Sequence, residues 1–102
     1  MKTVASVIAA ACLIAAGAAQ ANDKLAQTSG CMACHSVESK LIGPSFKDIA
    51  AKYRGNKAAE AELIKKVKSG GKGVWGDIPM TPNAHVKDED IKTLVQWTLS
   101  IK

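Results

Sequence analysis

Two cysteines stand two residues apart and a histidine follows the second directly, in the run Cys31-Met32-Ala33-Cys34-His35. This spacing is the attachment signature of c-type haem. Thiols about one helical turn apart can each bond one of the two vinyl groups at a haem edge, and the adjoining imidazole can then bind the iron. A small chain with this motif is predicted to fold around the cofactor, which becomes the centre of its core.

Other chemistries that use such residues fit the sequence less well. A thioredoxin-like redox pair needs a βαβ context, an iron–sulfur cluster usually needs four thiolates, and a disulfide across four residues would stabilise little. A zinc site would need both thiolates together with His35 and His85. No strand pattern is visible and no cysteine follows Cys34, so haem attachment is the favoured interpretation.

The first 21 residues have the three parts of a secretory signal peptide. A single lysine is followed by an uncharged, Ala-rich run that ends in Ala19-Gln20-Ala21, before the next charge at Asp23. A membrane-spanning anchor is the alternative, but a span needs roughly 20 strongly apolar residues. Lipidation at Cys12, inside this run, would leave an odd apolar linker behind. We therefore expect a cleaved signal peptide and a mature domain over residues 22–102.

The mature chain would be short and poorly supplied with core residues. Loss of 21 of the 102 residues leaves 81, and the net charge falls from +5 to +4. Its aromatic side chains are Phe46, Tyr53, Trp75 and Trp97. A domain of this size buries a limited share of its surface, so it would gain from a large apolar cofactor. This length excludes multidomain enzymes, transporters and large binding platforms.

The helical pattern predicts an all-α fold of about four short helices wrapped around one covalently bound haem. No segment alternates long enough to predict a strand, and residues 72–86 hold four Gly and Pro residues that favour a loop. The expected helices run from Asn22 or Asp23 toward the cysteine pair, from Phe46 through Tyr53 up to Gly55, through Leu63, Ile64 and Val67 up to Gly70-Gly71, and from about Asp88 to the end of the chain.

The function depends on which residue fills the second axial position of the iron. The candidates are Met32, Met80 and His85. Met32 lies between the cysteines and cannot reach the opposite face of a haem. Met80 is flanked by prolines in Ile78-Pro79-Met80-Thr81-Pro82-Asn83, and this irregular setting favours a ligand over an ordinary core residue. His85 is the rival ligand, and otherwise a residue that faces solvent before a helix.

From Gly30 to Lys102 the chain resembles the short-chain bacterial class I cytochromes c of the cytochrome c-551/c-552 type. The segments that carry the resemblance are Gly30 to His35, Ile42 to Asp48, Gly73 to Met80, and Trp97 in the last helix. This resemblance implies one haem c, bound covalently through two thioether bonds. It assigns the thioethers to Cys31 and Cys34 and the axial iron ligands to His35 and Met80.

The resemblance also implies four supporting contacts. The Pro44 carbonyl would accept a hydrogen bond from the ligand imidazole, the Trp75 indole would donate to a haem propionate, and Asn83 would orient the methionine sulfur. Lys66 stands where this group often has a propionate-binding Arg, and a Lys supplies charge without the bidentate fork. Each contact has a simpler alternative, in which Pro44 serves only to shape a turn, Trp75 to fill a half-buried position and Asn83 to cap a loop. The other aromatic residues, Phe46, Tyr53 and Trp97, are interpreted as haem-packing core.

Two protein ligands on the iron leave no position for oxygen, peroxide or a substrate, which argues against an enzyme. The expected function is a soluble periplasmic one-electron carrier whose iron cycles between Fe(III) and Fe(II). The alternatives are a haem enzyme or gas sensor, which would need Met80 absent or labile, and a haem-free domain with a structural disulfide. We expect a monomer with no stable membrane anchor.

The expected partners are other redox proteins. By resemblance these are nitrite reductases, cytochrome oxidases or peroxidases as acceptors, and quinol-linked cytochrome complexes as donors; nucleic acid is not expected outside the cytoplasm. Five lysines fall in or near segments expected to border the haem. A basic rim of this kind would speed the encounter with acidic partners more than it would strengthen binding, whereas the alternative is a solubilising surface. The five are Lys24, Lys40, Lys66, Lys72 and Lys87.

Overall fold

The computed structural model describes residues 22–102, and the predicted signal peptide lies outside them. Residues 22–28 are helical, and the elements that follow are the 3₁₀ helix η1 (Cys31–Ala33), α2 (Phe46–Lys52), α3 (Ala59–Ser69) and α4 (Asp88–Ser100). Residues 22–102 contain no β-strand beyond an isolated antiparallel bridge between Gly71 and Met80. The predicted all-α fold is therefore confirmed.

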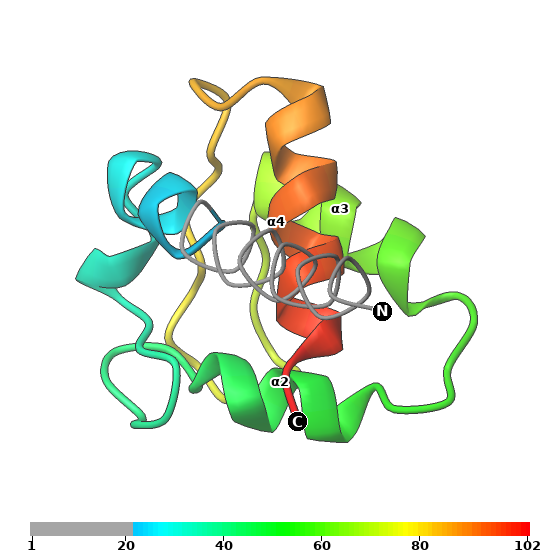
Figure 1. Ribbon diagram of the computed structural model, residues 1–102. Helices are drawn as coiled ribbons and strands as arrows, with labels where there is room; N and C mark the ends of the chain where they lie inside the picture. The colour runs from blue at the N-terminus through cyan, green and yellow to red at the C-terminus, as the bar shows by residue number, and fades with distance from the viewer. Residues whose placement is uncertain (1–21) are drawn as a thin grey trace, which may run out of the picture.

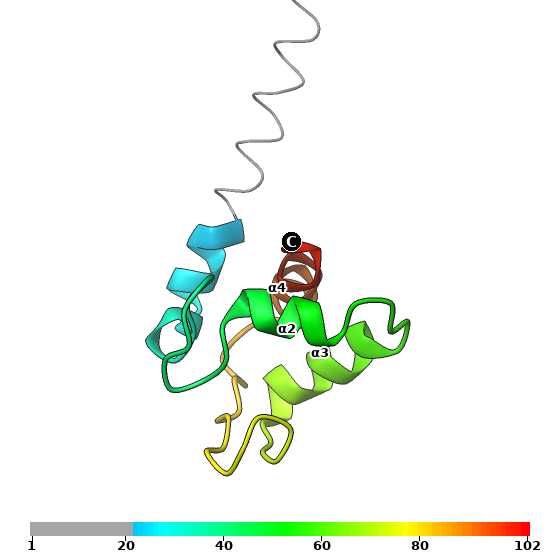
Figure 2. The same cartoon turned by 90° about the horizontal axis from the view of Figure 1, so that it is seen from below.

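Within residues 22–102 the longest helix is α4, which runs through the middle of this part, and α2 and α3 both pack against it (Figure 1). α2 crosses near the C-terminal end of α4, and the N-terminal helical segment and η1 lie on the side away from α3 (Figure 2). Polar contacts join α3 to α4: the Gln96 amide donates to the Glu60 carboxylate over 2.6 Å, and Lys68 forms an ion pair with Asp88.

The ends of the helices follow their local sequence. Ser45 caps α2, because its hydroxyl accepts a hydrogen bond of 3.0 Å from the Asp48 amide. α2 ends at Lys52, three residues before the predicted stop at Gly55. α4 begins at Asp88 as predicted, with three acidic residues in its first turn, where the positive end of the helix dipole favours anions.

The core is small, as the composition predicted. A buried cluster joins α4 to the N-terminal helical segment and to the loop before α4, and its members are Ala26, Val86, Ile91, Leu94 and Val95. Phe46 and Ala50 are the buried residues of α2. By contrast, residues 71–79 are all exposed. In the part of the chain that the structure describes, no helix is both long and apolar enough to span a membrane.

Candidate haem-binding site

A largely apolar cavity of about 210 Å³ lies between η1, α2, the end of α3 and the loop before α4. It brings together all eight residues singled out from the sequence, which are Cys31, Cys34, His35, Pro44, Lys66, Trp75, Met80 and Asn83. Phe46 and Trp97 also line it, as expected for core residues around a cofactor, whereas Tyr53 does not. Segments as far apart in the chain as Cys31 and Trp97 thus meet at one cavity.

The His35 imidazole is held in one orientation. Its Nδ1 lies 2.7 Å from the Pro44 carbonyl oxygen, which is the hydrogen bond that the resemblance implied. A carbonyl can only accept, so Nδ1 donates a proton, and Nε2 keeps the lone pair that a metal ion needs. The buried Phe46 ring stacks on the imidazole, with ring centroids 5.1 Å apart and planes 24° apart.

Gly43 makes room for this imidazole, a role that the sequence did not reveal. A Cβ atom at this position would lie 2.7 Å from Cε1 and 3.0 Å from Nδ1 of His35. Real Cβ atoms essentially never approach that closely. The Gly-Pro pair at 43–44 is a recognisable turn signal, but nothing in it shows which side chain the turn faces. The hydrogen bond to Pro44 and the stacked Phe46 ring therefore fix the imidazole, in space that Gly43 leaves free.

Both cysteines of the motif are free thiols on the cavity wall. η1 places them one turn apart, because the Cys34 and His35 amides both donate to the Cys31 carbonyl, over 3.2 and 3.0 Å. Cys34 is exposed and Cys31 is half-buried. Burial raises the pKa of the Cys31 thiol, and a backbone hydrogen bond offsets part of that rise. The two thiols therefore lie one turn apart and are not linked by a disulfide.

The Met80 backbone is bonded to the chain just after α3. Its amide donates to the Gly71 carbonyl over 2.7 Å, and its carbonyl accepts from the Gly71 amide over 3.1 Å. The Asn83 side chain also bonds to the backbone around the loop. The side-chain amide donates to the Val67 and Thr81 carbonyls, each over 3.1 Å. Within residues 22–102, Asn83 thus bonds to backbone and makes no hydrogen bond to the Met80 sulfur.

Trp75 forms part of the exposed rim of the cavity. The residue is 43% exposed, and the Lys52 ammonium lies 5.5 Å from the centroid of its ring, within the range of a cation–π contact. The sequence does not predict this contact, because Lys52 ends α2, whereas Trp75 lies in the loop after α3. Of the five lysines predicted to border the haem, only Lys66 and Lys72 line the cavity.

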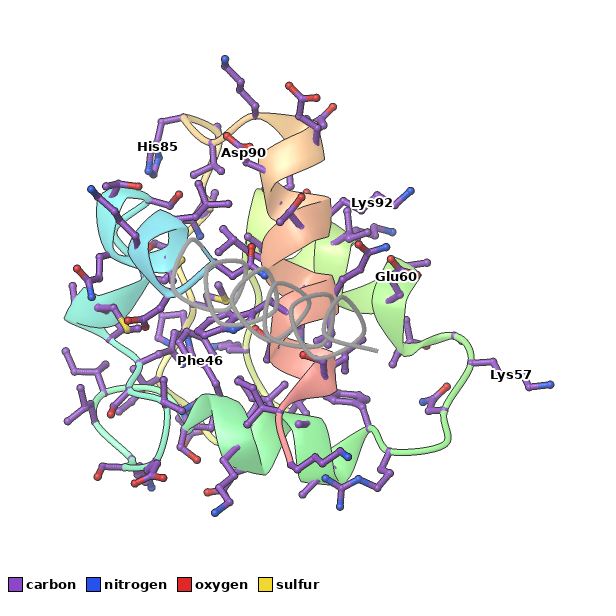
Figure 3. The ribbon with its side chains drawn as sticks, viewed as in Figure 1. Phe46, Lys57, Glu60, His85, Asp90 and Lys92 are labelled. Atoms are coloured by element: carbon purple, nitrogen blue, oxygen red, sulfur yellow. The ribbon has the colours of Figure 1, made fainter. Side chains whose placement is uncertain are left out.

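His85, the rival ligand, does not line the cavity. Its Nε2 lies 3.2 Å from the Ser29 carbonyl oxygen, which ties the loop before α4 to the segment that leads into η1. Figure 3 shows His85 above that segment. The residues that the structure describes contain no cluster of three or more His, Cys, Asp or Glu side chains placed to hold a metal ion.

Comparison with known proteins decides the family. The model of the cytochrome c family matches residues 15–102. The chain belongs to the cytochrome c family. It is 58% identical over 77 residues to the cytochrome c-551 of Allochromatium vinosum, which covers 76% of this chain and 82% of the relative. It is 50% identical to the cytochrome c-552 of Nitrosomonas europaea over the full length of both chains.

The fold agrees with this assignment. The crystal structure of the wild-type Nitrosomonas europaea cytochrome c552 superposes with a TM-score of 0.76 at 50% identity, covering 78% of this chain and 99% of that one. Our chain thus has the class I cytochrome c fold, binds haem c covalently and is an electron carrier. The residues present fit haem c: they line an apolar cavity, and they supply two free thiols and an imidazole whose Nε2 is available to a metal.

Proposed function

We propose that this cytochrome c is a soluble, monomeric one-electron carrier of the periplasm, exported with a signal peptide that is cleaved after Ala21. Cys31 and Cys34 form the two thioether bonds, and His35 and Met80 are the axial ligands. The proposal is supported chiefly by the His35 ring, whose Nδ1 donates to Pro44 and leaves Nε2 for iron in a cavity that the thiols and Met80 also line.

Electron transfer is fast when the iron ligands move little between the two oxidation states. This chain holds both ligand residues, His35 and Met80, firmly. When bound, haem c supplies an iron that gains and loses one electron. The His35 ring is fixed by a hydrogen bond and a stacked phenyl ring, and the Met80 backbone by two hydrogen bonds. A thioether ligand favours the ferrous state and raises the potential. With both axial positions taken by the protein, none is left for a substrate, and the chain is not an enzyme.

The rim of the cavity is suited to brief contact with redox partners. Its exposed apolar residues include Ile42, Val74, Trp75 and Ile78, and Lys66 and Lys72 add positive charge beside them. Short-lived electron-transfer complexes are small, and charge acts there mainly on the encounter rate. The acceptors we propose are nitrite reductases, cytochrome oxidases or peroxidases, and the donors are quinol-linked cytochrome complexes.

The test begins with the mature protein purified from a periplasmic extract. We expect the mass of an 81-residue chain plus one haem, and a low-spin spectrum with the weak near-infrared band that marks methionine sulfur on ferric iron. A high-spin spectrum would instead support a haem enzyme or gas sensor, and no haem spectrum would leave only a haem-free domain. Measuring which periplasmic or membrane fraction oxidises the reduced protein would then identify the partner.

A further inference from the structure

The loop that carries Met80 is tied to the end of α3 at two points, the Gly71–Met80 bridge and the bonds from Asn83 to Val67. Gly70 ends the helix, with its amide donating to the Lys66 carbonyl over 2.7 Å. Gly71 then forms the antiparallel bridge with Met80. Further along, the backbone amide and the side-chain amide of Asn83 both donate to the Val67 carbonyl, each over 3.1 Å. The ligand loop and the last turn of α3 are therefore one hydrogen-bonded unit.

Gly70 is the position in this unit where another residue would be most strained. Its φ of 78° and ψ of −178° fall in a region of backbone space that is essentially open to glycine alone. A Cβ atom there would also lie 2.6 Å from the Met80 carbonyl oxygen and 3.1 Å from the ring of Pro82. The backbone conformation and the close approach of the loop thus both require a hydrogen atom as the side chain.

The loop has little else to hold it. Residues 71–79 are exposed, and Met80 itself is only half-buried. Because both backbone groups of Met80 are bonded to Gly71, the place of the methionine depends on where the chain leaves α3. Any change that moves this exit point moves the ligand.

We propose that Gly70 is a positioning residue for the axial ligand, so that the end of α3 determines how firmly Met80 holds the iron. This inference rests on the proposed function, because it takes Met80 as the ligand. It predicts that opening of the last turn of α3 and release of the methionine are coupled events.

The variant Gly70→Ala tests the proposal, with Gly55→Ala as the matched control. Gly55 also has a positive φ, of 82°, but a Cβ atom there meets nothing within 4 Å. Both variants are prepared as full-length holoprotein and titrated with imidazole in the ferric state. Strain of the size found in glycine-only regions predicts that Gly70→Ala raises the apparent imidazole affinity by about tenfold or more and weakens the near-infrared sulfur band. Gly55→Ala should keep the wild-type band and affinity.

The possible results separate this proposal from the proposed function. A wild-type band and affinity in Gly70→Ala, or an equal loss in Gly55→Ala, overturns the positioning role alone. Absence of the band from the unmodified protein overturns the ligand assignment and the positioning role together. Hydrogen exchange on the unmodified holoprotein decides the matter if Gly70→Ala does not fold: the Gly70 and Met80 amides should be protected and exchange at similar rates. Free exchange of the Met80 amide beside an intact band would refute the proposal.

Discussion

Removal of the Phe46 ring should strongly destabilise this protein. It is 6% exposed at the start of α2 and points toward the interior (Figure 3). One face stacks on His35, and the Trp97 ring meets it edge-on at a centroid distance of 5.3 Å. Phe46 therefore joins the proposed iron ligand to α4.

The expected cost of Phe46→Ala follows from these contacts. Removal of a buried phenyl group from a protein core costs about 3–5 kcal/mol. Within that total, each aromatic pair contributes about 0.5–1.5 kcal/mol beyond the buried area. Phe46→Leu keeps most of the apolar volume and loses both ring contacts, so we expect it to cost about 1–3 kcal/mol. Small domains have a total stability of about 5–15 kcal/mol, so the alanine variant should lose between about a fifth and all of it.

Guanidinium unfolding of the holoprotein measures these differences, since a shift of the midpoint at constant slope reports a change in stability. The double variant Phe46→Leu with Trp97→Leu isolates the pair, and a coupling of about 0.5–1.5 kcal/mol is expected. A cost below about 1 kcal/mol for Phe46→Ala would refute the reasoning, because the ring would then contribute little to the core.

Three further predictions concern the attachment of haem, the loop that carries Met80 and the charged rim of the cavity. Replacing both Cys31 and Cys34 by Ser should abolish haem staining after denaturing electrophoresis, and a stained double variant would contradict thioether attachment. Asn83→Ala removes two hydrogen bonds to backbone carbonyls; it should lower the free energy of unfolding by about 1–2 kcal/mol, and an unchanged stability would make these bonds incidental. Lys72→Glu should slow electron transfer to an acidic oxidase or reductase, most clearly below 0.15 M salt, where the Debye length exceeds about 8 Å. Lys57→Glu is the charge-matched control away from the cavity; stopped-flow rates equally reduced in both variants would refute a basic docking rim.

Local sequence signals predicted much of this fold. The acidic run at residues 88–90 correctly marks the start of α4, and the Gly-Gly pair at 70–71 the end of α3. The Cys-x-x-Cys-His run predicts the cofactor because its chemistry lies within five consecutive residues. These predictions succeed because helix caps, dipoles and motifs act over one or two turns.

The contacts that the sequence did not predict join distant segments. Lys52 meets Trp75 across the mouth of the cavity, and Gly70 faces the Met80 carbonyl, ten residues on. In the sequence a glycine such as Gly70 indicates only a turn or a helix end. The sequence does not show which distant segment approaches it in space. Asn83 shows the same limit: its side-chain amide donates to the carbonyl of Val67, on another element, and the sequence did not predict this contact.

The identity of the sixth iron ligand is tested most directly by the near-infrared absorption of the ferric protein and of two variants. Met80 lines the cavity and His85 does not, so we predict that the unmodified protein and His85→Ala share the sulfur-to-iron band and a low-spin spectrum. Met80→Ala should lose the band and bind water or added imidazole. Loss of the low-spin spectrum in His85→Ala, together with its retention in Met80→Ala, would contradict the assignment of Met80 and with it the proposed electron-transfer site.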